Sequence, residues 1–447
     1  MPARTIDDYA RWLEERVPAC SQFHATALGI ARDLMPVHQA REEWRKLRLL
    51  ERLSLPDAVH TFTVEWEDDE GQVQLQRGWR VQHANLLGPY KGGLRFQRGL
   101  QLDTLRFLAL EQTYKGALTG LPLGGAKGGA DFDPEGRSAG EIMRFCQAFM
   151  TRLAPYIGPD RDVPAGDENV GEREIGFLFG QYRRLTGLHV GALTGKGPGY
   201  GGSKLRTEAT GYGVAYMARA VLARQEQSLE GQRVVISGAG NVALHAAERC
   251  LQLGARVLAL SDSRGYCHFP DGLAPEELAQ IKRTKLDDYG HLADCAGSLT
   301  ADYVGDGEVW EVECDLALPC ATQNEIGRAQ VEALAAGGCR LLIEGANGPV
   351  EPGAEDALAA ADIIRVPGKA ANAGGVAVSD FELAQQEGRL PWTRETLDAR
   401  LQQVMQAIHE RCVEFGEGED GRVDYAAGAN RAAFDRLARA MQAQGVG

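Results

Sequence analysis

Three features that would place this chain in a membrane, in a secretory pathway or around a structural metal are missing from its sequence. No apolar run approaches the ~20 residues that a helix needs to cross a bilayer. Met1–Arg11 carries charges of both signs without an apolar core, so no signal peptide is expected. The 9 cysteines include no Cys-x-x-Cys pair, which argues against a disulfide framework or a zinc site. We therefore expect a cytoplasmic protein with buried free thiols, no metal and no membrane partner.

The chain also has fewer basic than acidic residues. Lys and Arg number 48 against 62 Asp and Glu, and the net charge of −14 argues against a nucleic-acid partner, because such proteins favour basic surfaces. At 447 residues the chain exceeds what one hydrophobic core usually serves, so two domains are expected. An anionic substrate would then need a locally positive pocket.

Two familiar catalytic motifs are absent as well. Gly195-Lys196-Gly197 lacks the Ser or Thr that follows lysine in a P-loop, and its upstream glycine spacing is wrong. His409-Glu410 is followed by Val413 at the position where a zincin motif has its second histidine. The sequence therefore predicts neither a P-loop nor a zinc protease.

The most informative segment that is present is Leu121–Ala130, in which Lys127 lies between two glycine pairs. Glycine permits unusual backbone conformations and close approach of a ligand, so we interpret the segment as a flexible loop that holds a chemically active ammonium. Lys91 and Lys115 also lie next to glycines in the same N-terminal region. Together these three lysines predict a pocket for a small dianion.

The N-terminal region mixes helical and strand-like patterns. Apolar spacing predicts helices and a hairpin, and one helix would put Gln112 and Lys115 on a single face. Residues 159–171 are expected to be irregular. The expected helices lie within 5–55 and over 104–118 and 138–153, and the hairpin strands over 59–67 and 73–84.

Half of the positions in 191–202 are glycine, which predicts a loop or hinge with a domain boundary at its end. The first domain would be 1–202, with a C-terminal helix, 424–447, returning to it, and the second would be 203–423. Short apolar segments alternate with helices in the second domain, which predicts an α/β fold with a parallel, doubly wound sheet. The expected strands are 233–237, 256–261, 314–318, 340–343 and 362–366, the first helix is 241–253, and 392–447 is mostly helical.

A G-x-G-x-x-A pattern occupies 238–243, between a predicted strand and a predicted helix. Gly238 would make the tight turn and Gly240 would admit a pyrophosphate at the helix N-terminus. Asp262 ends the next strand, near the spacing expected for an acid that binds ribose. A tight turn without a ligand is the alternative interpretation.

The residues alone leave the choice of dinucleotide open. Asp262 favours NAD because its charge would repel a 2′-phosphate, whereas a nearby arginine can accommodate one. Ser263, Arg264 and Lys282 lie close enough in sequence to do so, although each could also be an ordinary surface residue.

Seven segments, in this order, resemble the Glu/Leu/Phe/Val dehydrogenases, specifically the hexameric NADP-type glutamate dehydrogenases of bacteria and fungi. The resemblance runs over nearly the whole chain. The segments are Gly88–Phe96, Leu121–Gly129, Asp162–Asp167, Arg206–Gly213, Pro319–Glu325, Glu344–Asn347 and Pro367–Val376.

The resemblance implies a catalytic role for Lys127, which would polarise a substrate carbonyl and stabilise a carbinolamine, and which for this needs a lowered pKa. Asp167 would act as general acid and base, although by itself it suggests a turn after Gly166. Lys115 and Gln112 would hold an α-carboxylate with help from the Gly166 backbone. Alone, Lys115 could simply be a cation at a helix C-terminus.

Lys91 and Ser379 would bind a γ-carboxylate and so decide the substrate. Branched-chain and aromatic amino-acid dehydrogenases carry apolar residues there, and a lysine facing an alkyl chain would be buried without a partner. By itself Ser379 suggests a helix cap. The implied reaction is the reversible reductive amination of 2-oxoglutarate with ammonia and NADPH to L-glutamate.

On the nucleotide side, the resemblance places Thr210, Asn241 and Asn347 near the nicotinamide and its ribose. It matches Ser263, Arg264 and Lys282 to contacts with a 2′-phosphate, which favours NADP while leaving NAD possible. It also implies a mixed sheet in the first domain, a Rossmann-like second domain and a homohexamer. The rival to an enzyme is a catalytically silent relative, which Lys127 and Asp167 disfavour.

Overall fold

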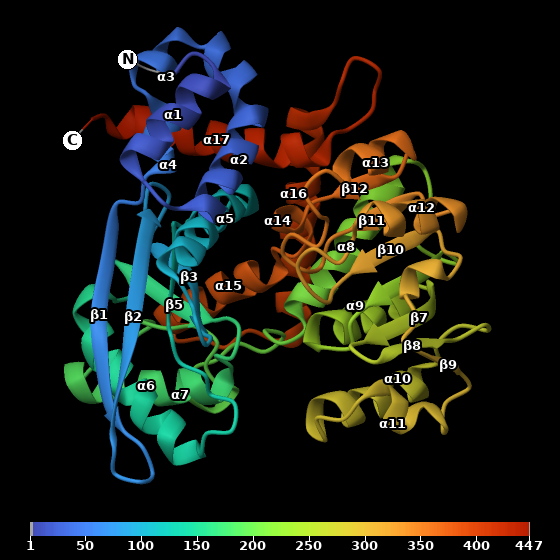
Figure 1. The fold of residues 1–447 in the computed structure, drawn as a ribbon, viewed down its shortest axis with the longest axis horizontal. Coiled ribbons are helices and arrows are strands. Elements are labelled where there is room, and N and C mark those ends of the chain that lie inside the picture. Colours follow the sequence, from blue (N-terminus) through green and yellow to red (C-terminus); the bar gives the residue numbers. More distant parts are fainter. Residues whose placement is uncertain (1–2, 447) are drawn as a thin grey trace. The chain divides into compact units, whose positions relative to one another are not determined.

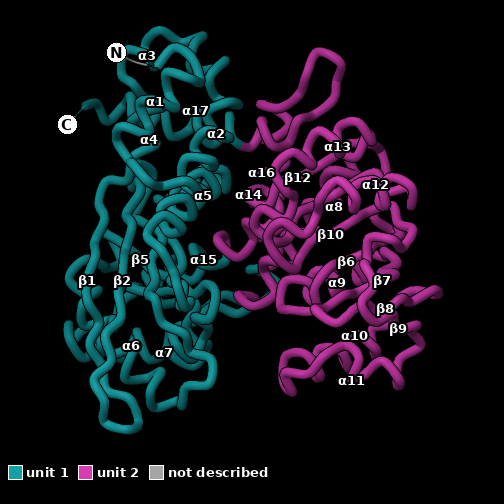
Figure 2. Tube along the Cα trace, in the orientation of Figure 1, with its two compact units in different colours: residues 1–204, 378–397, 430–447 teal, residues 205–377, 398–429 magenta. Residues whose placement is uncertain are grey.

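The computed structural model describes residues 3–446, which form two compact units (Figures 1 and 2). The first unit contains the chain up to Lys204, together with 378–397 and the segment from Asn430 onward. The second unit contains 205–377 and 398–429. Each unit is built around its own β-sheet.

The first unit contains a five-stranded mixed sheet in the order β1-β2-β4-β3-β5, which confirms the expected mixed sheet. β1 and β2 form the expected antiparallel hairpin, and β4 pairs antiparallel with β2 and parallel with β3. The strands are β1 (Ala58–Glu67), β2 (Val73–Ala84), β3 (Tyr90–Phe96), β4 (Gly125–Ala130) and β5 (Asp162–Gly166).

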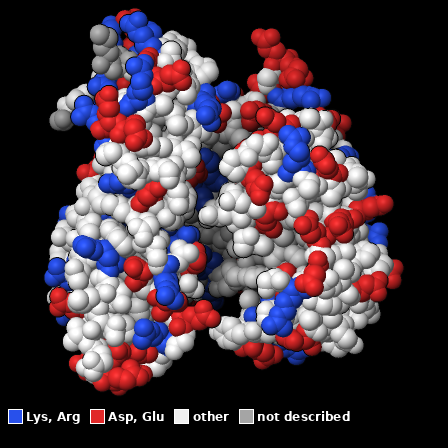
Figure 3. All heavy atoms as spheres, viewed as in Figure 1, with Lys and Arg blue, Asp and Glu red and all other residues white. Residues whose placement is uncertain are grey.

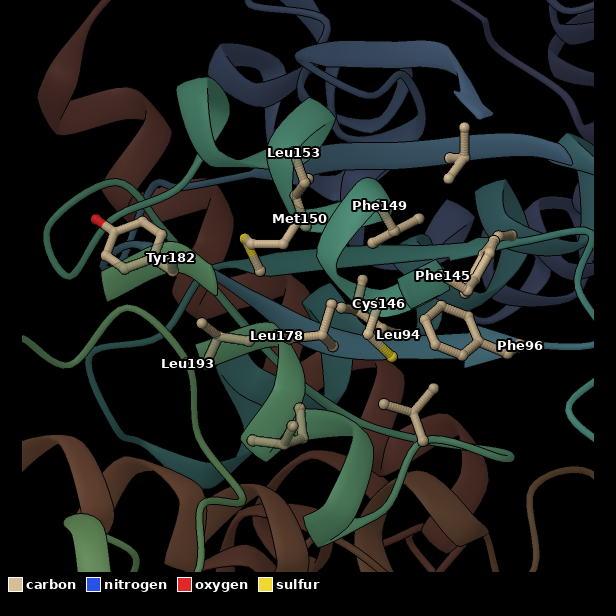
Figure 4. Packing of buried hydrophobic residues seen from close by; sticks show 14 of the residues in the cluster. Leu94, Phe96, Phe145, Cys146, Phe149, Met150, Leu153, Leu178, Tyr182 and Leu193 are labelled. Atoms are coloured by element: carbon tan, nitrogen blue, oxygen red, sulfur yellow. The ribbon is translucent and has the colours of Figure 1, made fainter. Parts of the chain in front are cut away.

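Helices cover both faces of this sheet. On one face, Leu94 and Phe96 of β3 pack among aromatic residues of α6 (Ala139–Leu153) and apolar residues of α7 (Glu172–Thr186), as Figure 4 shows. On the other face, α5 (Leu102–Thr119) packs Leu105 and Ala109 against Trp79 and Val81 of β2. Because side chains alternate along a strand, each strand presents one set of residues to each face.

The last helix of the chain is tied to α5 in the first unit. Arg436 of the last helix donates hydrogen bonds to the carbonyl oxygens of Ala117 (2.9 Å) and Gly120 (2.8 Å), which satisfies groups that a helix C-terminus leaves unpaired. The remaining α-helices with residues in this unit are α1 (Ile6–Arg16), α2 (Ser21–Ala40), α3 (Glu42–Lys46), α4 (Leu49–Ser54), α15 (Gly374–Gly388), the start of α16 (Arg394–Gly416) and α17 (Tyr425–Gln444).

The second unit contains a seven-stranded sheet in the order β12-β11-β10-β6-β7-β8-β9. The first five strands in this order are parallel, and the chain leaves β6 on one side toward β7 and returns on its other side at β10, as in a doubly wound fold. The strands are β6 (Arg233–Ser237), β7 (Arg256–Asp262), β8 (Gly265–His268), β9 (Asp302–Gly305), β10 (Leu316–Pro319), β11 (Leu341–Ile343) and β12 (Ile364–Val366).

The helices of the second unit connect these strands. The longest complete one, α8, precedes β6, and α9 follows it at the glycine turn. The helices are α8 (Ala209–Arg224), α9 (Asn241–Gln252), α10 (Pro275–Lys282), α11 (Leu292–Ala296), α12 (Arg328–Ala336), α13 (Glu355–Ala360), α14 (Gly368–Ala371) and most of α16 (Arg394–Gly416).

Three local expectations were wrong. The segment around Lys127 is not a flexible loop but the fully buried strand β4, and the segment expected to be irregular contains β5. Glycine has a low intrinsic preference for strands, so the pairing of β4 with β2 and β3 decides its conformation. The second sheet is not wholly parallel, because β8 and β9 add an antiparallel edge.

Three features of the described residues concern membrane-spanning helices, cysteines and clusters of metal-binding side chains. No helix within residues 3–446 is both long and apolar enough to cross a bilayer. All 9 cysteines are buried free thiols, as expected, and no group of three metal-binding side chains occurs in the described part of the chain. Acidic and basic side chains intermix on the visible face of each unit (Figure 3).

Candidate active site

Lys127 and Asp167 form a direct ion pair inside the first unit. Lys127 Nζ lies 2.9 Å from Asp167 Oδ2, and Arg95 Nε donates to the same oxygen at 2.9 Å. The side chain of Lys127 is only 7% exposed and that of Asp167 is 21% exposed. One carboxylate is thus held between two cations, and it remains open to a small ligand.

The strand register explains why these side chains meet. Lys127 is opposite Val81 of β2, on the α5 face, and Arg95 lies opposite Gly129 on that same face of β4. Asp167 follows β5, on the far side of β3. It can reach across because Gly93 has no side chain, since a Cβ there would lie 2.7 Å from the Cβ of Asp167.

The electrostatics of the pair suit proton chemistry. Burial lowers the pKa of Lys127, and the nearby Arg95 lowers it further, although Asp167 opposes the shift. Burial alone would raise the pKa of Asp167, but the adjacent cations, Lys127 first and then Arg95, outweigh it and hold that pKa well below its usual range. Without substrate, the pair therefore consists of a Lys127 ammonium that is more acidic than usual and an ionised Asp167 carboxylate.

A second buried lysine, Lys91 of β3, lies in the same unit. It is 2% exposed, and its Nζ donates a 2.7 Å hydrogen bond to Thr194 Oγ1. Ser379 is buried inside α15, not at its N-cap, so the capping interpretation does not apply. Next to it in sequence, Asp380 is half-buried, and this burial raises its pKa to about 6. The charge of Glu387 adds to the increase, whereas the charge of Lys91 opposes it.

The other predicted substrate residues also lie in this unit. Gln112 and Lys115 are both half-buried on α5, three residues apart. Gln112 lies against β3, because its Cγ would be 3.3 Å from a Cβ at Gly92. Gly166 is the last residue of β5, directly before Asp167. The structure thus collects every predicted catalytic and substrate residue on one sheet and the helices next to it.

The predicted dinucleotide turn lies in the second unit, at the carboxyl end of β6. Gly238 has φ +84°, which favours glycine, and its N–H donates to Ser261 Oγ at 3.0 Å. A Cβ at Gly238 would lie 3.2 Å from Ala321 Cα after β10, whereas a Cβ at Gly240 would meet open space. The turn therefore lies where the strand order reverses, with room in front of the N-terminus of α9.

Asp262, at the end of β7, is held by several donors. It accepts hydrogen bonds from the N–H groups of Arg264 (3.0 Å) and Leu292 (2.8 Å), and from Lys285 Nζ at 3.0 Å. Burial alone would raise its pKa, but these donors lower it. Ser263 and Arg264 are exposed next to it.

The cation at Asp262 is Lys285 rather than Lys282. Lys282, at the end of α10, pairs instead with Glu248 of α9 at 3.0 Å. Lys285 lies in the π-helical turn Arg283–Asp287 that follows α10, and such turns are frequent at functional sites. Sequence reasoning missed Lys285, because a π-turn shifts which side chains share a face and carries no simple sequence pattern.

The predicted nicotinamide-side residues are also in the second unit. Thr210 is in the first turn of α8, and Asn241 Nδ2 donates to the carbonyl oxygen of Thr207 at 2.6 Å. Asn347 is exposed and accepts a 2.9 Å hydrogen bond from Nδ2 of Asn372. Asn372 was missed, yet its buried Oδ1 has no hydrogen-bond partner among the described residues and is suited to a ligand N–H.

Two missed residues in the first unit differ in how they could have been found. Arg95 is four residues from Lys91 on a strand, so alternation alone could have placed it on a face with other charged groups. Thr194 is 103 residues from Lys91, and only the folded chain brings them together.

The fold and the glycine turn define a dinucleotide-binding α/β protein. Residues 201–445 match the family model described as Glutamate/Leucine/Phenylalanine/Valine dehydrogenase, and residues 56–184 match that of the Glu/Leu/Phe/Val dehydrogenase dimerisation domain. The chain belongs to the Glu/Leu/Phe/Val dehydrogenase family.

Individual relatives resemble the chain over nearly their whole length. It is 47% identical to an NAD(P)-specific glutamate dehydrogenase of Xylanibacter ruminicola, over 97% of this chain and 98% of the relative. It is 46% identical to an NADP-specific glutamate dehydrogenase of Salmonella typhimurium, over 99% of each. A crystal structure of Plasmodium falciparum glutamate dehydrogenase superposes with a TM-score of 0.96 at 42% identity, covering 99% of this chain and 94% of that one.

Proposed function

We propose that this chain is an NADP-dependent glutamate dehydrogenase, which converts 2-oxoglutarate, ammonia and NADPH reversibly to L-glutamate and NADP⁺. The observation that carries the proposal is the pairing of two buried lysines with different partners on one sheet. Lys127 contacts the carboxylate of Asp167, as proton chemistry requires, whereas Lys91 donates to the hydroxyl of Thr194 and lies near Asp380, whose pKa is raised to about 6. The buried ammonium of Lys91 would bind an anionic group of a ligand.

The substrate would be held at both ends by the first unit. Gln112 and Lys115 would bind the α-carboxylate, with hydrogen bonds from the backbone of Gly166. Lys91 and Ser379 would bind the γ-carboxylate through charge-assisted hydrogen bonds. Both Lys91 and Ser379 are almost wholly buried, so these bonds would form away from competing water.

Lys127 would act first on the substrate carbonyl. Its ammonium donates a hydrogen bond to the C2 oxygen, makes C2 more electrophilic, and passes a proton to that oxygen as ammonia adds. The lowered pKa of Lys127 favours this transfer. The resulting carbinolamine loses water to give the imine.

Asp167 would handle the remaining protons. Once Lys127 turns to the substrate, the carboxylate loses one of its two cations, and its pKa rises toward the range in which it can accept a proton. It then takes a proton from the added nitrogen and returns it to the departing hydroxyl. Arg95 keeps Asp167 oriented throughout.

The second unit would hold the dinucleotide. Its residues fit one, since the turn at Gly238 leaves space before the N-terminus of α9 and Asn372 offers an unpaired amide oxygen. NADPH, when bound, supplies the hydride. Asp262 would bind ribose, while Lys285, Ser263 and Arg264 would bind the 2′-phosphate. Thr210, Asn241 and Asn347 would contact the nicotinamide end.

Two other substrate or cofactor choices are less well supported. A branched-chain or aromatic amino-acid substrate would leave the Lys91 charge buried against an alkyl group, which costs several kcal/mol. A preference for NADH is disfavoured because Lys285 neutralises the acid at Asp262 that would repel a 2′-phosphate.

The wider setting belongs to the same proposal. We assign substrate binding and oligomer contacts to 1–202 with 424–447, joined by 378–397 of the first unit, and dinucleotide binding to the rest of 203–423. The assembly would be a homohexamer in the cytoplasm, because the resemblance is to hexameric enzymes and the thiols are reduced.

Steady-state kinetics of the purified chain test the proposal. Initial rates of NADPH and NADH oxidation are measured with 2-oxoglutarate and ammonia, and with 4-methyl-2-oxovalerate in place of 2-oxoglutarate. We expect the highest kcat/KM with NADPH and 2-oxoglutarate. A higher value with the branched 2-oxo acid would refute the substrate assignment, and a higher value with NADH would refute the cofactor assignment.

A further inference from the structure

We propose that Glu382 is a positioning residue for the distal-carboxylate subsite, acting through the segment 193–196. The inference rests on the proposed function, because it assigns to Glu382 a role in substrate binding by Lys91. Glu382 touches neither Lys127 nor Asp167 in any described contact. Its effect would reach the substrate through Thr194 and Lys91.

Glu382 lies on α15 and forms a buried ion pair with Lys196. Glu382 Oε1 is 2.8 Å from Lys196 Nζ, and the two side chains are 0% and 1% exposed. The second carboxylate oxygen accepts the N–H of Gly195 at 2.9 Å, and Oε1 also accepts the N–H of Lys196 at 3.4 Å. Lys196 Nζ donates in addition to the carbonyl oxygen of Leu193. The ion pair therefore holds the backbone on both sides of Thr194, through Glu382 after it and through the side chain of Lys196 before it.

Thr194 is the link to the substrate pocket. It is wholly buried, its N–H donates to the carbonyl oxygen of Pro164 in β5 at 3.0 Å, and its hydroxyl accepts from Lys91 Nζ. Loosening of the segment would move the hydroxyl that directs Lys91. The ammonium of Lys91 would then no longer be held in position to bind a distal carboxylate.

The same face of α15 carries both Glu382 and Ser379. These residues are three apart, and Gln386 follows four residues later, so the three form one stripe along the helix. Gln386 Nε2 donates to the carbonyl oxygen of Gly201 at 2.7 Å. The stripe thus binds the glycine-rich segment at two points, through Glu382 and Gln386, and Ser379 continues the same face of the helix.

A buried ion pair is weak evidence of a contribution to stability, because both charges lose their hydration. Burial lowers the pKa of Lys196, and Glu382 opposes that shift. Leu193 and Thr194 are fully buried, whereas the following residues, 195–202, have glycine at five of eight positions and so offer few side chains to define the path of the backbone. Fixing that path is the role that the contacts of Glu382 support.

The test compares two substrates that differ only in the distal group, 2-oxoglutarate and 2-oxovalerate. For Glu382→Gln we expect KM for 2-oxoglutarate to rise about tenfold, the loss of one well-placed hydrogen bond to a charged group. Neither kcat for 2-oxoglutarate nor kcat/KM for 2-oxovalerate should change by more than about twofold, since the catalytic pair is untouched. Equal losses for both substrates, or a loss in kcat alone, would overturn the proposal.

Three further variants separate positioning from folding. Gln386→Ala, which breaks the other contact of the same helix face, should keep the wild-type KM for 2-oxoglutarate. Glu382→Asp should restore part of the lost affinity. The double variant Lys196→Met with Glu382→Leu removes both buried charges, so it should fold even if Glu382→Gln does not. It should show the raised KM, and a wild-type KM in the folded double variant would overturn the proposal.

Failure of the proposed function would look different. In that case the wild-type chain itself would not turn over 2-oxoglutarate with ammonia and NADPH. If the wild type is active but the Glu382 variants keep the wild-type KM for 2-oxoglutarate, the proposed function is supported and the role of Glu382 is refuted.

Discussion

Replacing Lys91 with leucine should change which 2-oxo acid the enzyme prefers. Lys91 is 2% exposed and donates to Thr194 at 2.7 Å, so a bound γ-carboxylate would meet its charge in a largely dry environment. The substitution removes that charge and leaves an apolar side chain of similar length. Because Ser379 and Thr194 remain, the pocket keeps polar groups.

The magnitude follows from the burial of the site. Truncating one partner of a buried, hydrogen-bonded charge pair costs about 2–5 kcal/mol, so kcat/KM for 2-oxoglutarate should fall by roughly 30-fold to 4,000-fold in Lys91→Leu. Loss of the lysine also removes the cation that opposes the raised pKa of Asp380, so that carboxyl should be mostly protonated at neutral pH. A neutral Asp380 would then tolerate an alkyl substrate.

The assay is NADPH oxidation with 2-oxoglutarate and with 4-methyl-2-oxovalerate, for the wild type, Lys91→Leu and the double variant with Ser379→Val. Preference should move toward the branched acid in the single variant and further in the double variant. As a control, KM for NADPH should stay unchanged, because no described dinucleotide residue lies in the first unit. An unchanged preference for 2-oxoglutarate would refute the γ-carboxylate assignment.

Three other predictions concern pH, cofactor choice and geometry. Asp380 has a pKa raised to about 6, so its negative charge appears as pH rises through that value and should weaken 2-oxoglutarate binding; the KM–pH profile should show this rise, and Asp380→Asn should abolish it. Lys285→Ala should raise KM for NADPH about tenfold and KM for NADH much less, since one phosphate contact is lost; equal effects on both would argue against a 2′-phosphate role. Gly93→Ala places a Cβ 2.7 Å from that of Asp167, so kcat should drop about 10²-fold with little change in circular dichroism, and near-normal kcat would contradict the geometry.

Local sequence patterns predicted most elements of the fold. Alternation predicted the β1-β2 hairpin, and the glycine pattern at 238–243 predicted a turn between strand β6 and helix α9. The strand containing Lys127 was missed, because glycine-rich β4 owes its conformation to strands on both sides of it. The antiparallel edge formed by β8 and β9 also depends on pairing that short segments do not encode.

In the site, too, single residues could be predicted from the sequence, but the contacts between them could not. The resemblance pointed to Lys127, Asp167 and Lys91 one by one, but their partners are far away in sequence. Lys196 and Glu382 are 186 residues apart, and no local pattern links them. The choice of Lys285 over Lys282 at Asp262 depends on a π-helical turn.

The measurement that tests the central claim most directly is the turnover of Lys127→Ala with saturating 2-oxoglutarate, ammonia and NADPH. If the buried Lys127–Asp167 pair carries the chemistry, kcat should fall by at least about 10³, a combined loss of proton transfer and carbonyl polarisation. Calorimetric titration with 2-oxoglutarate should still detect binding, because Lys91 and Lys115 are intact. Near-normal kcat in this variant would contradict the account.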